Sequence, residues 1–217
     1  MPIELTRAGA VSTASEEEVE LLRQDFGEHH FLRLPRLLEP GLLEYYLDEI
    51  GDAGFEERVH EGIGTELWLR DPRVAGGLDF LFNHPLLLEL VEAVAACGPV
   101  RSFGGRVYRF PPDDEGYSDS WHDDIEGNRL VALSINLSPE PYLGGRLEIR
   151  NRHTQVTVAR VDNRGLGDAV LFRIDEELQH RVTPVRGTAA RTAYAGWFRS
   201  EPDYRALLAA ARSGAER

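Results

Sequence analysis

The spacing of apolar residues predicts helices in the first part of the chain. Four segments have an apolar stripe at helical spacing: residues 15–27, 40–51, 74–82 and 85–97. Ser15 followed by Glu18 is a capping-box signature, and Pro40 suits the first turn of the second helix. Gly98 ends the fourth. Residues 1–14 are expected to be a loosely held lead-in.

After residue 100 the pattern changes to short apolar segments separated by Gly, Pro, Asn and Asp. Strands are predicted at residues 101–110, 118–124, 130–137, 146–150, 155–161, 169–174, 180–185 and 192–198. Eight strands at this spacing suggest a double-sheet jelly roll, which uses its mouth as a pocket. A helix at 203–212 is expected to close the chain.

The fold predicted is mainly β with flanking helices. A double-stranded β-helix (jelly roll) core has N-terminal α-helices packed on it, in a single domain over residues 1–217. Residues 1–100 form the helical elaboration, 101–200 the core, and 201–217 a C-terminal helix and tail. A strand at 31–34 and a Gly-punctuated stretch at 55–73 belong to the first part. That stretch is either a pair of edge strands or a lid over the mouth.

Composition excludes several classes of protein. The net charge of −13 argues against a protein that wraps nucleic acid, which needs a concentrated basic surface. The single cysteine, Cys97, excludes an internal disulfide framework and a cysteine-based zinc site. The sequence has no signal-peptide pattern and no apolar run of about 18 residues, so we expect a cytoplasmic protein without a membrane partner.

The segment SDSWHDD at residues 118–124 carries the candidate chemistry. In an extended chain His122 and Asp124 project to the same face, so they offer a nitrogen and an oxygen to one point. A second histidine from a distant strand would complete the two-His, one-carboxylate face that holds non-haem Fe(II), and His180 is the candidate. Arg191 opens the next strand, where its guanidinium can fork onto a carboxylate of a cosubstrate.

Several motifs in a fixed order carry a resemblance to a known family. They are WHDD at 121–124, NRLVALSINLS at 128–138, YLGGRLEI at 142–149, GDAVLF at 167–172, and HRV at 180–182 followed by Arg191 and Trp197. Over residues 101–198 the sequence resembles the Fe(II)/2-oxoglutarate-dependent oxygenase superfamily, in its prolyl-hydroxylase-like branch.

The resemblance implies roles for individual residues. His122, Asp124 and His180 would ligate Fe(II), and Arg191 would pair with the C5 carboxylate of 2-oxoglutarate. Asn136 stands where such enzymes often place a polar side chain facing that carboxylate.

Three further residues concern the cavity. Tyr108 and Trp197 are expected to face it by strand alternation, Tyr108 beside the cosubstrate and Trp197 beside the substrate. Arg106 is a second candidate for substrate binding. The alternative for Arg106, as for Arg146 and Arg150, is a solvated face of the barrel.

The implied activity is hydroxylation of an unactivated C–H bond. The substrate would be a small molecule, such as an amino acid or natural-product intermediate, or a residue in a peptide. Decarboxylation of 2-oxoglutarate to succinate and CO2 would accompany it, with O2 as oxidant and ascorbate as a stimulant. Asp124 favours hydroxylation, because related halogenases lack this carboxylate. The alternatives are an oxidative nucleic-acid demethylase and a cupin-like metal-binding module without catalysis.

Overall fold

The computed structural model of the protein describes residues 2–114, 116–162 and 165–202. The four helices in these ranges are α1 (Glu16–His29), α2 (Pro40–Asp52), α3 (Pro72–Phe82) and α4 (Pro85–Ala95). Ser15 and Glu18 form the predicted capping box at the start of α1. The helix predicted at 203–212 lies outside the described residues.

Most strands belong to two antiparallel sheets. The large sheet has the order β3-β11-β7-β14-β6-β5-β4, and the small sheet has the order β10-β9-β12. The large sheet contains β3 (Phe31–Leu34), β11 (Ala169–Arg173), β7 (Arg129–Asn136), β14 (Arg191–Arg199), β6 (Ser102–Phe110), β5 (Gly64–Leu69) and β4 (Phe55–His60). The small sheet contains β10 (Thr157–Val161), β9 (Leu147–Asn151) and β12 (Leu178–Val182). The predicted jelly-roll core is confirmed.

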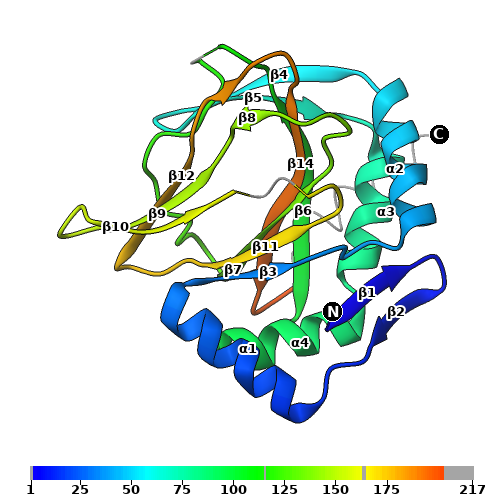
Figure 1. Ribbon diagram of the computed structural model, residues 1–217, viewed down its shortest axis with the longest axis vertical. Helices are drawn as coiled ribbons and strands as arrows, with labels where there is room; N and C mark the ends of the chain where they lie inside the picture. Colours follow the sequence, from blue (N-terminus) through cyan, green and yellow to red (C-terminus); the bar gives the residue numbers. More distant parts are fainter. Residues whose placement is uncertain (1, 115, 163–164, 203–217) are drawn as a thin grey trace.

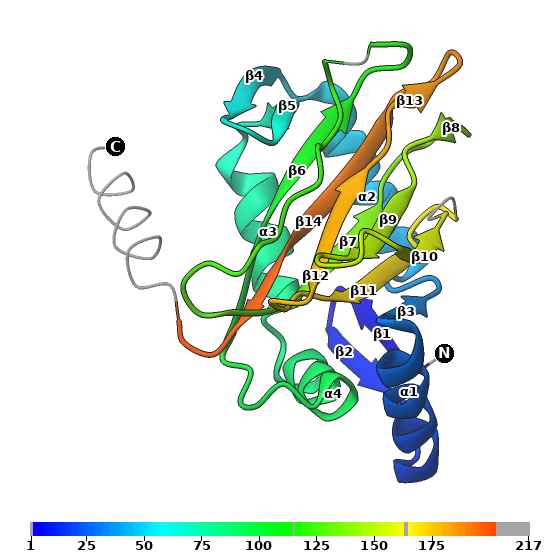
Figure 2. The same ribbon diagram turned by 90° about the vertical axis from the view of Figure 1, so that its left-hand side faces the viewer.

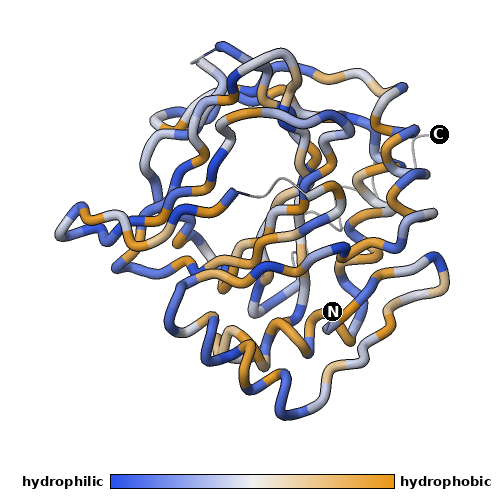
Figure 3. Tube along the Cα trace, in the orientation of Figure 1, coloured by the Kyte–Doolittle hydropathy of each residue, from blue (hydrophilic) through white to orange (hydrophobic). Residues whose placement is uncertain are grey.

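The centre of the large sheet is buried on both faces, which explains the nearly continuous apolar sequence of β7. Val131, Leu133 and Ile135 pack in the main core with the helices, whereas Ala132 packs toward the small sheet. Figures 1 and 2 show the helices on one side of the large sheet and the small sheet on the other. Apolar segments concentrate on the strands and helices around this interior (Figure 3). A cavity lies between the two sheets, lined by Ala132 and Val170 from the large sheet and by Leu147 from the small sheet.

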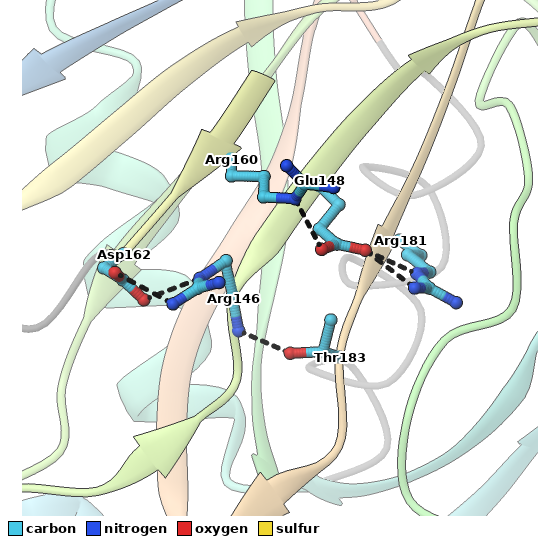
Figure 4. Close-up of polar contacts among 6 residues, drawn as sticks. All are labelled: Arg146, Glu148, Arg160, Asp162, Arg181 and Thr183. Carbon is cyan, nitrogen blue, oxygen red and sulfur yellow. Dashed lines mark hydrogen bonds and ion pairs between the residues drawn. The ribbon is translucent and has the colours of Figure 1, made fainter. Parts of the chain in front are cut away.

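The outer face of the small sheet is polar. Glu148 on β9 accepts from Arg181 on β12 and from Arg160 on β10, so the three side chains form a row across the strands (Figure 4). Arg146 beside them pairs with Asp162 at 3.0 Å. Strand alternation therefore turns Arg146 away from the space between the sheets, and it is not a substrate ligand.

Three expectations about local structure were wrong, wholly or in part. The lead-in expected at residues 1–14 is not loosely held where the structure describes it, because β1 (Ile3–Thr6) and β2 (Gly9–Ser12) form a hairpin in which Ile3 and Leu5 are fully buried. The segment at 118–124 is not a strand and makes only two isolated bridges, Gly64↔Asp119 and His122↔His180. The predicted strand at 180–185 is split, since β12 ends at Val182 and Val185–Arg186 forms β13, which pairs with β8 (Leu143–Gly144).

The stretch at 55–73 supplies edge strands. β4 and β5 form a hairpin at the edge of the large sheet, and β5 joins β6 through Leu67↔Arg109 and Trp68↔Tyr108. Within the described ranges no single helix is long and apolar enough to cross a membrane. α3 and α4 pass that test only as a pair bent by 61°.

Candidate active site

Three side chains from two segments, the loop at 118–124 and strand β12, converge inside the barrel. One donor atom from each of His122, Asp124 and His180 lies within 4.8 Å of the others. The backbones of His122 and His180 exchange two hydrogen bonds, of 3.1 and 2.8 Å, and this pairing holds the loop against β12. Residues 118–124 do not form the predicted strand, but the side chains of His122, Asp124 and His180 converge as the sequence predicted.

The donor set fits a single metal ion. His180 Nε2 lies 3.1 Å from Asp124 Oδ2. Two donors that bind one ion at right angles, each about 2.1 Å from it, lie about 3 Å apart. Two imidazoles and one carboxylate form the facial set that non-haem Fe(II) prefers.

Other side chains fix the orientation of these donors. The Nδ1 atom of His122 lies 2.8 Å from the carbonyl oxygen of Ser120, and since a carbonyl only accepts, this nitrogen is the donor and Nε2 is left for a metal. Trp197 Nε1 donates to Asp124 Oδ2 at 2.9 Å. Arg129 lies over the Trp197 ring and its Nη1 is 3.4 Å from Asp124 Oδ1.

The electrostatics of Asp124 match its position. Burial alone would raise the pKa of its carboxyl, but the hydrogen bond and charge of His180, the charge of His122 and the Trp197 hydrogen bond lower the pKa well below its usual range. Asp124 is therefore an anion at neutral pH although it is only 9% exposed. An ionised carboxylate is the form that binds a cation.

Arg191 lies in the same cavity and is only 4% exposed. Its Nη1 donates to the Tyr108 hydroxyl and its Nη2 donates to Ser134 Oγ at 3.2 Å. Tyr108 was expected beside Arg191, but Ser134 was not. Ser134 lies two residues before Asn136 and so on the same side of β7, and this spacing could have indicated it from the sequence.

Asn136 does not face the cavity. Its Oδ1 accepts from the backbone N–H of Ser138 at 3.1 Å, and its Nδ2 donates to the Gly165 carbonyl at 3.2 Å. It lies at the end of β7, where it holds two turns, and it is absent from the cavity lining. The expectation for Asn136 was wrong, and Ser134 takes the place beside Arg191.

Gly145, in the YLGGRLEI segment, packs directly against the side chain of Arg191. It has a φ of +57°, and a Cβ atom there would lie 2.7 Å from Arg191 Cδ and 2.9 Å from a ring carbon of Tyr142. Only glycine fits such a position without strain. The motif is thus explained by close packing against the buried guanidinium.

A cavity of about 1090 Å³ surrounds these groups and extends from Val170 and Phe172 between the sheets to Phe80 on α3. Trp197 and Arg106 line it, as expected for substrate contacts. Arg106 does not lie on an open solvated face, however, because its side chain is only 25% exposed.

Arg106 is held in a buried ion pair that the sequence did not reveal. It donates to both carboxylate oxygens of Glu66, at 2.6 and 2.8 Å, and His60 Nε2 approaches the same carboxylate at 3.0 Å. Its guanidinium lies beside the rings of Tyr108 and Trp197. Glu66 comes from β5, 40 residues before Arg106 in the chain, so this pairing could not be chosen from the sequence.

Asp119 is a further carboxylate of the cavity lining, close to the predicted ligands. Burial raises the pKa of its carboxyl, an effect that the charges of His122, His180, Arg191 and Arg106 only partly offset. Its backbone N–H donates to the Val182 carbonyl at 3.1 Å. The sequence prediction had not singled it out.

Arg150 does not reach the cavity. Its Nε and Nη2 donate to the Gln179 side chain, and its guanidinium lies over the Trp121 ring, which Arg181 also contacts. Arg150 is therefore a half-buried residue outside the cavity lining.

Comparison with known proteins agrees with this architecture. Residues 105–199 match the model of the 2OG-Fe(II) oxygenase superfamily. No curated protein sequence matches the chain.

Among solved structures, a Pseudomonas putida prolyl-4-hydroxylase is similar at 19% identity and a TM-score of 0.60, covering 85% of this chain and 100% of that one. A Trichoplax adhaerens prolyl hydroxylase, solved with a hypoxia inducible factor peptide fragment, has 17% identity and a TM-score of 0.59, with 90% and 97% covered. The α-ketoglutarate-dependent epimerase SnoN from nogalamycin biosynthesis has 15% identity and a TM-score of 0.62, with 88% and 89% covered.

The fold and the matched segment define the class. The match over residues 105–199 confirms the resemblance to the 2OG-Fe(II) oxygenase superfamily, and prolyl hydroxylases are among the solved structures that share the fold. This family implies Fe(II), 2-oxoglutarate and O2 as reagents, and an oxidoreductase. The solved structures include both hydroxylases and an epimerase, and at these identities they establish the fold alone.

Proposed function

We propose that the protein is an Fe(II)/2-oxoglutarate-dependent dioxygenase that hydroxylates an unactivated C–H bond. The substrate is a small molecule, such as an amino acid or a natural-product intermediate, or a residue in a peptide. The observation that carries the proposal is the convergence of His122, Asp124 and His180, with the buried Arg191 lining the same cavity.

His122, Asp124 and His180 would hold the metal. Three protein ligands leave half of an octahedral coordination sphere open for reagents. Ferrous iron, with 2-oxoglutarate and O2, supplies the oxidising chemistry that cleaves a C–H bond and yields succinate and CO2. Trp197 and Ser120 keep the carboxylate and one imidazole in the orientation that binding requires.

Arg191 would bind the distal carboxylate of 2-oxoglutarate. Tyr108 and Ser134 accept from its guanidinium and fix its plane. The Tyr108 hydroxyl accepts from Arg191 and keeps its own O–H to donate to that carboxylate. Phe172, Val170 and Leu147 line the cavity and limit access of water to the reacting groups.

The cavity does not favour the demethylase alternative. Arginine and carboxylate side chains line it in equal numbers, whereas a nucleic-acid groove needs an excess of basic groups. The cupin-like alternative predicts metal binding that does not depend on 2-oxoglutarate. Titration of 2-oxoglutarate into the metal-loaded protein distinguishes it from the proposed enzyme.

Titration of 2-oxoglutarate into the Fe(II)-loaded protein, without O2, is the direct test. Binding that requires metal and is lost in His180→Ala supports the proposal. Succinate formation under O2, with ascorbate present, should then rise when a substrate is added, and the product should be heavier by one oxygen atom. Metal binding without any 2-oxoglutarate dependence would instead identify a binding module, and a product of unchanged mass would indicate epimerisation.

A further inference from the structure

Asp119 is fixed at the wall of the cavity from two sides. Its backbone pairs with Val182 at the end of β12 and with Gly64 at the start of β5. The next residue, Ser120, binds the turn of the β4–β5 hairpin through the carbonyls of Ile63 and Gly62, each at 2.8 Å. The carboxylate of Asp119 is thereby held in the cavity three residues before His122.

The carboxylate of Asp119 has no hydrogen-bond partner among the residues that the structure describes. The two nearby arginines are bound elsewhere, since Arg106 forks onto Glu66 and Arg191 onto Tyr108 and Ser134. The carboxylate of Asp119 therefore depends on water for its hydrogen bonds. A substrate that fills the cavity displaces this water, and an ionised carboxylate left without a donor is strongly unfavourable.

The balance of charge around the metal indicates the kind of donor. Each arginine near the predicted ligands already has a partner, since Arg106 pairs with Glu66, Arg129 with Asp124, and Arg191 is assigned to the distal carboxylate of 2-oxoglutarate. Within the described ranges, Asp119 is then the carboxylate without a paired cation beside the reaction site. Burial raises the pKa of this carboxyl, and a cation bound beside it favours the ionised form. A cationic group is the partner that satisfies both its charge and its hydrogen bonding.

We propose that Asp119 binds an ammonium or guanidinium group of the substrate, so that the enzyme acts on an amine such as a basic amino acid or a basic residue of a peptide. The proposal rests on the proposed function. Asp119 is then the specificity-determining residue, because a neutral substrate of the same shape would leave its carboxylate desolvated.

The test compares matched probes and one isosteric substitution. The protein is loaded with Mn(II), which replaces Fe(II) without turnover, and with 2-oxoglutarate. Binding of n-butylammonium and of n-butanol is then measured by calorimetry. We expect the amine to bind at least about tenfold more tightly, and this preference to disappear in Asp119→Asn.

Glu126→Gln is the control, because Glu126 also lines the cavity and carries the same charge but is largely exposed. This variant should keep the preference for the amine. Equal binding of the two probes to the wild-type protein, or an unchanged preference in Asp119→Asn, overturns the proposal.

Binding of 2-oxoglutarate, measured first, separates this proposal from the proposed function. Asp119→Asn should bind 2-oxoglutarate and metal as the wild-type protein does, so a lost amine preference in a fully loaded protein concerns the substrate alone. A wild-type protein that fails to bind 2-oxoglutarate overturns the proposed function, and the assignment of Asp119 with it.

Discussion

The indole N–H of Trp197 should control how tightly the site binds metal. The Trp197 Nε1–Asp124 Oδ2 distance is 2.9 Å, and among the described residues no other donor outside the predicted ligands reaches this oxygen. Arg129 Nη1 lies 3.4 Å from the other oxygen, Oδ1. Trp197→Phe removes this N–H but keeps an aromatic ring beneath Arg129. A hydrogen bond to a charged acceptor is worth about 1.5–3 kcal/mol, which corresponds to roughly a 10–100-fold weaker metal affinity.

The affinity is measured by titrating Mn(II) and following the signal of the free ion by electron paramagnetic resonance. Trp121→Phe is the matched control, because Trp121 directly precedes His122 but lies between Arg150 and Arg181. It should bind Mn(II) like the wild-type protein. A Trp197→Phe variant that is folded and binds Mn(II) with unchanged affinity would refute the role assigned to this hydrogen bond.

Three further predictions concern the surroundings of the metal site. Arg191→Met should raise the KM for 2-oxoglutarate about 100-fold or more in a succinate assay while metal affinity stays the same, and a parallel loss of both would contradict the assignment. Gly145→Ala should lower the melting temperature and raise the same KM, since its Cβ would meet Arg191, at a strain of about 1–3 kcal/mol. Burial raises the pKa of Glu66, but Arg106 and His60 lower it more, so the pKa in the folded protein lies below the unfolded value near 4.5. The ionised Glu66 therefore stabilises the fold above pH 4.5. That stability is lost as the pH falls through the lower folded pKa. Denaturant unfolding between pH 3 and 7 should therefore show a weaker acid dependence in Glu66→Gln, and a wild-type acid dependence in that variant would count against the pair.

The local pattern of the sequence was sufficient for most secondary structure. The helix and strand bounds followed the apolar period, the capping box and the positions of Gly and Pro. The hairpin of residues 3–12 was missed because Ile3 and Leu5 are only two apolar positions, too few to indicate a strand. Their side chains are buried in the main core, where the backbone of Leu5 is hydrogen-bonded to Leu37 and Glu39. The loop at 118–124 was missed because its apparent alternation comes from two separate bridges, not from a continuous ladder.

Residue identity and order determined the candidate metal site, because few arrangements use two histidines, a carboxylate and a following arginine in this way. Only the tertiary structure decided what surrounds it. It places Ser134 instead of Asn136 beside Arg191, pairs Arg106 with Glu66, and leaves the carboxylate of Asp119 without a hydrogen-bond partner in the described part of the chain. The physical reason is that ligand chemistry belongs to the side chains themselves. The partner of a buried charge depends on which distant strand closes the cavity over it, and no local pattern carries that information.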